Sequence, residues 1–164
     1  MRKPRTRELD PSHAADPERV RLAAVTLLAR RDYASGELRQ KLEGQGYEAG
    51  AVSAALADLV ASKIVDDARF AENYVTSHAA RGHGPVRIAA DLRALNLPAE
   101  LIDAALAAGP DWRARAREVR IRRFGLEEPV TWAQKARQGR FLQYRGFSSD
   151  HIRAALGADF DPDE

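Results

Sequence analysis

The sequence predicts an all-α protein built from three tandem repeats of three helices, each repeat spanning about fifty residues. Two observations support this prediction. Ala, Leu, Arg and Glu dominate the 164 residues and no alternating apolar run reaches five residues, so strand signals are nearly absent. Apolar side chains also recur at a fixed offset of fifty residues. The related positions are Leu42, Leu92 and Leu142; Val52, Ile102 and Ile152; Ala55, Ala105 and Ala155; and Leu56, Leu106 and Leu156.

The turns between helices recur at the same offset. Gly46, Asn96 and Gly146 occupy equivalent positions, and the residues that follow them are Tyr47, Leu97 and Phe147. Gly and Asn tolerate the left-handed backbone conformation that closes a helix, and the next apolar side chain can then fold back onto the last helical turn. Because each unit buries little apolar surface by itself, the repeats are expected to stack into an elongated array.

The first repeat is expected to contain helices at residues 18–31, 35–45 and 49–62. Ser35 is the expected N-cap of the second of these helices. Tyr33 and Tyr47 flank that helix and are interpreted as packing residues. The expected core positions are Leu22, Val25, Leu28 and Ala29 in the first helix, Leu38 and Leu42 in the second, and Val52, Ala55, Leu56 and Leu59 in the third.

Six further helices are expected in the second and third repeats, at residues 67–81, 85–95, 98–108, 111–124, 131–145 and 148–156. The expected N-caps are Asp66, Asp111 and Ser148, while Pro85 and Pro98 fit the first turn of a helix. Helical spacing favours Trp112 and Trp132 as core anchors rather than as base-stacking residues. The third copy has a longer connection at residues 125–130 and places Gln138 where the other repeats have Leu38 and Ile88.

These elements divide the chain into five segments. We expect an N-terminal tail at residues 1–16, repeats at residues 17–65, 66–109 and 110–157, and an acidic C-terminal tail at residues 158–164. The charge is unevenly distributed among them. Residues 111–156 carry 11 basic and five acidic side chains, whereas residues 157–164 carry four acidic side chains and no basic one.

The composition is that of a globular protein, with 45% hydrophobic and 30% charged residues. The chain has no cysteine, which excludes disulfides, thiolate nucleophiles and Cys-based metal sites. No apolar run approaches the roughly 18 residues of a membrane span, and the N-terminus lacks the apolar stretch of a secretory signal. We therefore expect a cytoplasmic protein that does not associate with membranes.

Residues that could carry catalysis are scarce. The four histidines lack metal-ligand spacing, which favours surface or hydrogen-bonded roles for them. The Gly82-His83-Gly84-Pro85 segment lacks the Lys-Ser/Thr of a phosphate-binding loop and is interpreted as a turn between helices. Asp66 and Asp67 are interpreted as a helix cap and a helix-dipole partner rather than as paired catalytic acids. We expect no enzymatic activity, no cofactor and no metal.

The third repeat contains the densest basic stretch, residues 112–124. On a helix, Arg113, Arg117 and Arg120 would lie together on one stripe and would be exposed. Such a cluster is expected to meet nucleic-acid phosphate or an acidic protein surface, because the arginine fork pairs with both phosphates and carboxylates. The candidate partner-binding residues are Arg113, Arg117, Arg120, Lys135, Arg137, Arg140 and Arg145.

Several strings between about Pro17 and Leu156 are specific in combination. They include Glu37-Leu38-Arg39-Gln40-Lys41-Leu42, Asp66-Asp67-Ala68-Arg69-Phe70-Ala71 followed by Tyr74, Arg81-Gly82-His83-Gly84-Pro85-Val86-Arg87-Ile88, and Arg145-Gly146-Phe147-Ser148. With these strings the chain resembles the RecX family of bacterial regulators of the RecA recombinase. The resemblance implies a right-handed, curved array of three three-helix units. It also implies a cytoplasmic protein that docks in the groove of the RecA–DNA filament and inhibits filament extension, strand exchange and co-protease activity. Such a protein would regulate DNA repair, recombination and the SOS response, and we expect it to be a monomer.

Other functions stay open from the residues alone. The runner-up is a DNA-binding regulator with helix-turn-helix-like units, which the three-helix units and the basic helix favour. Acidic side chains in the first two repeats, and the lack of a helix with an Asn/Gln/Arg reading surface, count against it. A scaffold unrelated to DNA is a third alternative. Direct contact with single- or double-stranded DNA also stays open under the leading hypothesis.

Overall fold

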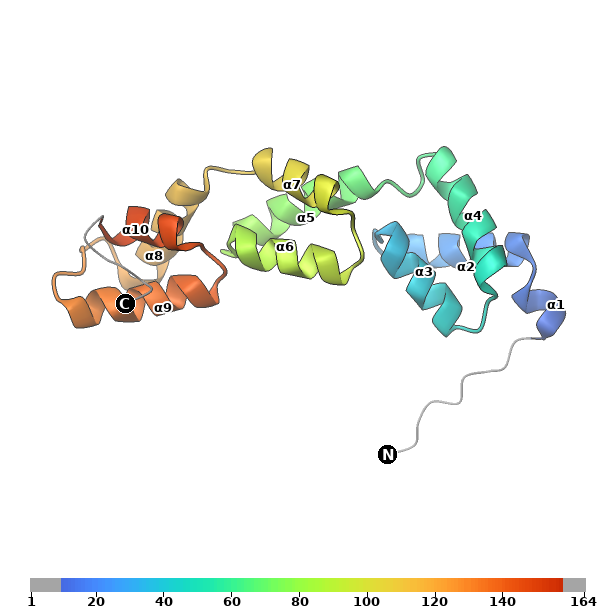
Figure 1. The fold of residues 1–164 in the computed structure, drawn as a ribbon, viewed down its shortest axis with the longest axis horizontal. Helices are drawn as coiled ribbons and strands as arrows, with labels where there is room; N and C mark the ends of the chain where they lie inside the picture. The colour runs from blue at the N-terminus through green and yellow to red at the C-terminus, as the bar shows by residue number, and fades with distance from the viewer. Residues whose placement is uncertain (1–9, 158–164) are drawn as a thin grey trace, which may run out of the picture. The chain divides into compact units, whose positions relative to one another are not determined.

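The computed structural model describes residues 10–157 of the chain. These residues form ten α-helices and no β-strand (Figure 1). The helices are α1 (Pro11–Ala14), α2 (Pro17–Leu28), α3 (Ser35–Gly44), α4 (Ala49–Ala61), α5 (Asp67–Ala80), α6 (Pro85–Ala94), α7 (Ala99–Ala107), α8 (Trp112–Phe124), α9 (Trp132–Tyr144) and α10 (Ser149–Leu156). The predicted all-α class is confirmed, and each predicted helix has a counterpart whose ends agree within three residues.

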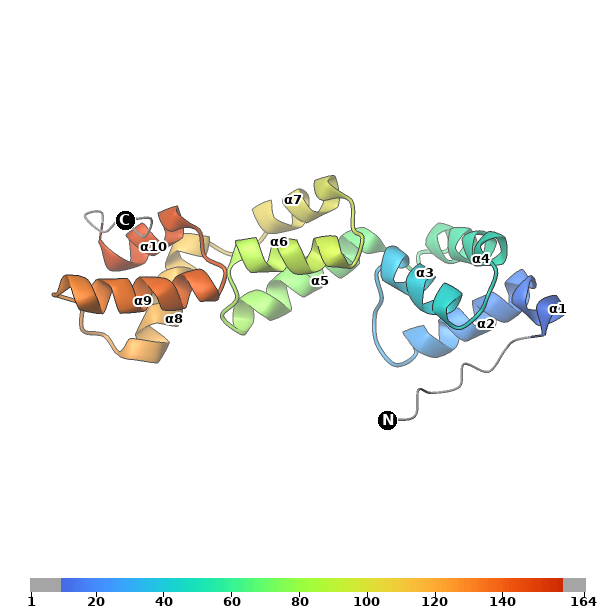
Figure 2. The same ribbon diagram turned by 60° about the horizontal axis from the view of Figure 1, so that its bottom comes forward.

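The chain divides into two compact units. Within the described part of the chain, the first comprises residues 10–70 and 95–97, and the second comprises residues 71–94 and 98–157. The helices that follow α1 form three groups of three, namely α2–α4, α5–α7 and α8–α10 (Figures 1 and 2). Within residues 10–157 no helix combines the length and the apolar character needed to cross a membrane.

The core of the first unit is apolar. Its buried side chains include Val20, Ala24 and Leu27 of α2, Leu38 and Leu42 of α3, and Val52, Ala55, Leu56 and Leu59 of α4. Tyr33 is buried among them and Tyr47 packs against them, which confirms both as packing residues. The core faces of α3 and α4 are those predicted from the sequence.

The predicted core face of α2 is only partly correct, because Leu28 packs against the core whereas Leu22, Val25 and Ala29 are exposed. Leu22 is 70% exposed and Val25 is 39% exposed, whereas Val20 and Ala24 are fully buried. Most residues from 20 to 28 are apolar or small, so two neighbouring faces of this helix both show the helical period. Packing of α2 against α4 decides which face is buried.

Residues 10–16 differ from the tail that was predicted there. The Asp10 carboxylate accepts a hydrogen bond from the Ser12 N–H at 2.9 Å and caps α1. Ala14 is buried, and its carbonyl accepts a hydrogen bond of 2.9 Å from the Glu48 N–H, which ties α1 to the start of α4. The rest of the two predicted tails, residues 1–9 and 158–164, lies outside the described residues.

Two adjacent aspartates cap two different helices. Asp66 accepts a hydrogen bond from the Arg69 N–H at 3.1 Å at the start of α5, and this bond lowers the pKa of Asp66. Asp67 accepts hydrogen bonds from the N–H and the hydroxyl of Ser35, at 2.7 and 2.5 Å. Ser35 is therefore the first residue of α3 and not its N-cap, which is Ala34. The prediction for Ser35 failed because a carboxylate 32 residues away satisfies the end of α3.

The other predicted caps are largely confirmed. Asp111 and Ser148 are the N-caps of α8 and α10, and Pro85 is the first residue of α6. Pro98 lies one residue earlier than predicted, at the N-cap of α7.

The predicted left-handed turns are also present. The φ angles are +100° at Gly46, +62° at Asn96 and +91° at Gly146. After α3, Gly46 N–H donates to Glu43 O at 2.9 Å and Tyr47 N–H donates to Leu42 O at 3.3 Å. The same pair of bonds closes α9, and together they form the Schellman cap that the repeat pattern predicted.

In the second unit, two turns bind the second and third groups of helices to each other. The Gly84 N–H donates to Arg145 O at 2.8 Å, and the Val86 N–H donates to Gly146 O at 3.0 Å. A Cβ atom on Gly84 would overlap the backbone of Gly146, and a Cβ atom on Gly146 would overlap Arg87. Both glycines are therefore required by the close approach of two backbones.

The core of the third group contains Ala116 and Val119 of α8, Ala136 and Leu142 of α9, Phe147, and Ile152 and Leu156 of α10. Trp112 packs against this core and its Nε1–H donates to Leu106 O at 3.2 Å, as expected for a core anchor. The same prediction for Trp132 is wrong, because this side chain is 66% exposed. Trp132 is the first residue of α9, at the end of the long connection from α8, and the small residues Ala136 and Gly139 occupy the buried side of the helix.

Candidate anion-binding surface

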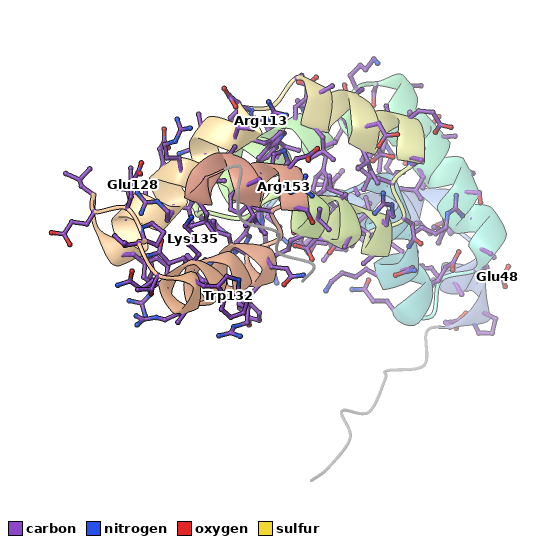
Figure 3. The ribbon with its side chains drawn as sticks, turned by 60° about the vertical axis from the view of Figure 1, so that its left-hand side comes forward. Glu48, Arg113, Glu128, Trp132, Lys135 and Arg153 are labelled. Atoms are coloured by element: carbon purple, nitrogen blue, oxygen red, sulfur yellow. The ribbon has the colours of Figure 1, made fainter. Side chains whose placement is uncertain are left out.

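The structure divides the seven predicted partner-binding residues among different environments. Arg113 and Arg117 lie on the α10 side of α8, where Arg117 Nη2 donates to Ala154 O at 3.1 Å. Figure 3 shows Arg113 on α8 well apart from Trp132 and Lys135 on α9. Lys135 and Arg145 are half-buried, whereas Arg137 and Arg140 are exposed on α9. The predicted set is therefore not one contiguous cluster.

The prediction that Arg120 is exposed is wrong. Its side chain is 3% exposed, and Nη1 donates to Glu127 O at 3.0 Å and makes a long contact of 3.5 Å with Gln138 Oε1. Its buried Nε has no hydrogen-bond partner. Arg120 adjoins Ala116 and Val119 on the buried face of α8, and Gln138 of α9 offers an acceptor where the other repeats have an aliphatic residue. The Arg120 side chain is therefore not accessible to a binding partner.

The outer face of α9 combines cations with exposed rings. Ala133, Arg137, Arg140 and Tyr144 follow one another at intervals of three or four residues and so share one helix face. Tyr144 is 80% exposed, and Trp132 lies exposed at the start of the same helix. Since α9 contains no Asp or Glu, no carboxylate of its own offsets these charges.

Four further cations surround a hollow beside α9. Arg81, Arg122, Arg123 and Arg145 line it together with Gly82 and Phe141, and its volume is about 120 Å³. We call it the arginine hollow. Arg81 comes from the turn between α5 and α6, Arg122 and Arg123 from the last turn of α8, and Arg145 from the end of α9. None of the four forms an ion pair with a carboxylate of residues 10–157.

Aromatic rings contact two of the four guanidinium groups of this hollow, those of Arg123 and Arg145, and also that of Arg137 on α9. Phe124 packs edge-on against Phe141 with ring centroids 5.3 Å apart. The guanidinium carbons of Arg123 and Arg137 lie 5.6 and 5.4 Å from the Phe124 ring, and that of Arg145 lies 5.4 Å from the Phe141 ring. These distances are in the range of cation–π contacts, which orient a guanidinium without neutralising it.

A histidine pair lies close to the same turns. The Nδ1 atoms of His78 and His83 are 3.0 Å apart, so that one neutral ring donates to the other, and Tyr74 stacks on His78 at 3.9 Å. Burial lowers the pKa of both histidines, and nearby arginines lower it further: Arg81 for His78, and Arg87 for His83. Both imidazoles therefore favour the neutral form. No group of three or more His, Cys, Asp or Glu residues that could hold a metal occurs in residues 10–157.

Comparison with known proteins gives the family. Models of the first, second and third three-helix domains of RecX match residues 21–59, 66–106 and 111–156. A regulatory protein RecX from Halorhodospira halophila is 46% identical over 151 residues, which cover 92% of this chain and 94% of the relative. The chain belongs to the RecX family.

Other RecX proteins agree with this assignment. One from Stenotrophomonas maltophilia is 41% identical over 142 residues and 86% of each chain. The crystal structure of RecX from Lactobacillus salivarius matches with a TM-score of 0.76 at 19% identity and covers 87% of this chain and 96% of its own. That likeness shows that the fold is shared. The RecX family is a family of regulatory proteins and not a known enzyme family.

The sequence alone did not identify the complete arginine hollow. Arg122 and Arg123 belong to the dense basic stretch of α8, but helix geometry gave no reason to prefer them to Arg113 and Arg117. Arg81 lies in a RecX-like string that reads as a turn, and only the docking of the Gly84 turn onto the Arg145–Gly146 turn brings it to α9.

Proposed function

We propose that this chain regulates the RecA recombinase by binding the RecA–DNA filament and inhibiting its extension, strand exchange, ATPase and co-protease activities. It acts as a cytoplasmic monomer without catalysis of its own, and so regulates DNA repair, recombination and the SOS response. The observation that carries the proposal is the match of all three RecX three-helix domains along the chain. The proposal includes direct contact with DNA.

Six of the seven predicted partner-binding residues are the proposed contacts with the filament. The α9 set contains the exposed Arg137 and Arg140 and the half-buried Arg145, and the α8 set contains the exposed Arg113 and Arg117. Lys135 is half-buried and stays with the α9 set, whereas the buried Arg120 is excluded. The α9 set has more support, because it adjoins exposed aromatic rings and the arginine hollow and has no acidic residue on its helix.

The decisive experiment titrates the protein into RecA and single-stranded DNA and follows the DNA-dependent ATPase rate. We expect a dose-dependent decrease in this rate. If saturating protein leaves both the ATPase rate and strand exchange unchanged, the proposed function is wrong. Specific binding to one duplex sequence without RecA would instead favour the helix-turn-helix-like regulator.

Paired charge reversals distinguish the two sets. We expect Arg137→Glu with Arg140→Glu to weaken filament binding about tenfold or more, because each reversal replaces an attraction with a repulsion. Arg113→Glu with Arg117→Glu is the matched variant on the other side of the same helix group. Circular dichroism should show unchanged helical content in both, since exposed charges contribute only about 0–1 kcal/mol each to stability. Equal losses in both variants would assign the interface to both sides of the group.

A further inference from the structure

The arginine hollow is built from three separate chain segments. The backbone bonds from Gly84 N–H and Val86 N–H to the Arg145–Gly146 turn hold the α5–α6 turn beside the end of α9. Gly82, which is buried, and Phe141 form its lining between the guanidinium groups. The positions of the charges are therefore set by the fold and not by one flexible loop.

Among residues 10–157, no carboxylate forms an ion pair with the arginines of the hollow. Of the acidic residues near it, Asp91 pairs with Arg87 and Glu118 pairs with Arg115. The four guanidinium groups of the hollow have no such partner within residues 10–157. Four like charges around one small hollow repel each other, and an anion that enters relieves this repulsion while it accepts forked hydrogen bonds.

The surroundings of the hollow favour a nucleic-acid strand as the source of that anion. Cations continue from the hollow along α9 through Arg137 and Arg140, as a chain of regularly spaced phosphates requires. Exposed rings lie on the same helix. Tyr144 directly precedes Arg145, and Trp132 lies at the opposite end of α9. Bases can stack on such rings only when they are unpaired, and acidic protein segments gain nothing comparable from them.

We propose that the arginine hollow binds one backbone phosphate of single-stranded nucleic acid, with Arg81, Arg122, Arg123 and Arg145 as its ligands and the bases lying toward Tyr144. A hollow of about 120 Å³ admits a phosphate group, while the attached sugars and bases stay on the surface. This deepens the DNA contact in the proposed function, but it concerns the protein without RecA and is tested separately.

The test measures binding of a fluorescently labelled oligothymidylate to the full chain by anisotropy, without RecA, at several salt concentrations. The variant is Arg122→Ala with Arg123→Ala, and the matched control is Arg93→Ala with Arg21→Ala, two arginines outside the hollow. We expect the hollow variant to bind about tenfold more weakly. The logarithm of the association constant decreases as the logarithm of the salt concentration rises. For the hollow variant this dependence should be less steep by about 0.7, the value for one lost phosphate contact, while the control keeps the parent slope.

Three further binding measurements identify the ligand. For an oligomer of the same length with a neutral methylphosphonate backbone, the parent and the hollow variant should have the same affinity. A duplex should compete less well than the single strand, and Tyr144→Ala should remove part of this preference. Polyglutamate of equal charge that competes as well as the oligonucleotide would overturn the assignment to nucleic acid in favour of an acidic protein segment.

Two outcomes separate this inference from the proposed function. If the hollow variant binds the oligonucleotide like the parent, the inference is wrong even where RecA inhibition is intact. If it loses oligonucleotide binding while the parent fails to inhibit RecA, the phosphate site stands and the regulatory proposal fails. Circular dichroism and tryptophan fluorescence confirm folding, and Arg122→Lys with Arg123→Lys, which keeps the charge without the fork, should bind between the parent and the alanine variant.

Discussion

The helix groups α2–α4 and α8–α10 differ in what fills one equivalent core position. In the first group, Leu38 is fully buried in an apolar cluster with Val20 and Leu42. In the third group the equivalent position holds Gln138, which is also buried and faces the guanidinium of Arg120. The repeat register therefore determines which positions are buried, but it leaves their polarity free.

This difference carries an energetic consequence. A buried guanidinium loses its hydration, and Arg120 recovers only the Glu127 carbonyl and a long contact with Gln138, while its Nε stays unpaired. We infer that the third group is less tolerant of change in its core than the first. The same group carries the exposed arginines, so its inner and outer charges have to be tested separately.

The largest expected effect comes from reversing the buried charge. Arg120→Glu places an unpaired carboxylate against the Gln138 and Glu127 carbonyl oxygens, and should destabilise the third group by about 3–5 kcal/mol. Arg113→Glu, an exposed reversal on the same helix, should change stability by no more than about 0.5 kcal/mol. Both tryptophans of the chain lie in this group, so urea unfolding followed by tryptophan fluorescence reports on it directly. Equal midpoints for the two variants would contradict the burial of Arg120.

The second effect compares the two glycine turns. Gly46→Val should cost about 1–2 kcal/mol, because a β-branched residue is strained in the left-handed region. Gly146→Val adds the overlap of its Cβ with Arg87, which should raise the cost to about 3 kcal/mol or more. Thermal unfolding by circular dichroism measures both.

If Gly46→Val proves as costly as Gly146→Val, the contact between the Gly84 and Gly146 turns contributes little. Unchanged melting of both variants would contradict the cap assignment itself.

The smallest expected effect is a pH dependence of the second unit. Burial lowers the pKa of His78, His83 and His151 below the ordinary histidine value of about 6.5, so the folded chain binds fewer protons than the unfolded chain. The free energy of unfolding should be constant above about pH 6.5 and should decrease as the pH falls below it. Protonation also breaks the bond between His78 and His83 and adds charge near Arg81, Arg87 and Arg145, with Asp91 as the opposing carboxylate.

Urea midpoints between pH 7.5 and pH 5 measure this dependence. The variant His78→Gln with His83→Gln should be less sensitive to acid than the parent. A midpoint that rises on acidification would contradict the assigned neutral pair.

The amino-acid sequence by itself determined the all-α class, the register of the three repeats and the turns at Gly46, Asn96 and Gly146. These features depend on local geometry: helical spacing, the left-handed conformation after a helix and the short reach of Asp111 and Ser148 to the next turn. The helices and turns can be worked out from residues a few positions apart, and the register of the repeats follows from their recurrence at an offset of fifty residues. The strings that resemble the RecX family also include Gly84 and Gly146, which lie in two turns whose backbones approach each other closely.

Only the tertiary structure decided what depends on distant residues. It selected Val20 and Ala24 over Leu22 and Val25 on α2, because two apolar faces were available and α4 covers one of them. It let Asp67 cap α3 and buried Arg120 against Gln138. It also brought Arg81 beside Arg145, because the backbone bonds of two turns align segments that are sixty residues apart in the sequence. Periodicity gives the spacing of side chains on one helix, but the packing of other helices against that helix decides which of these side chains are exposed to solvent.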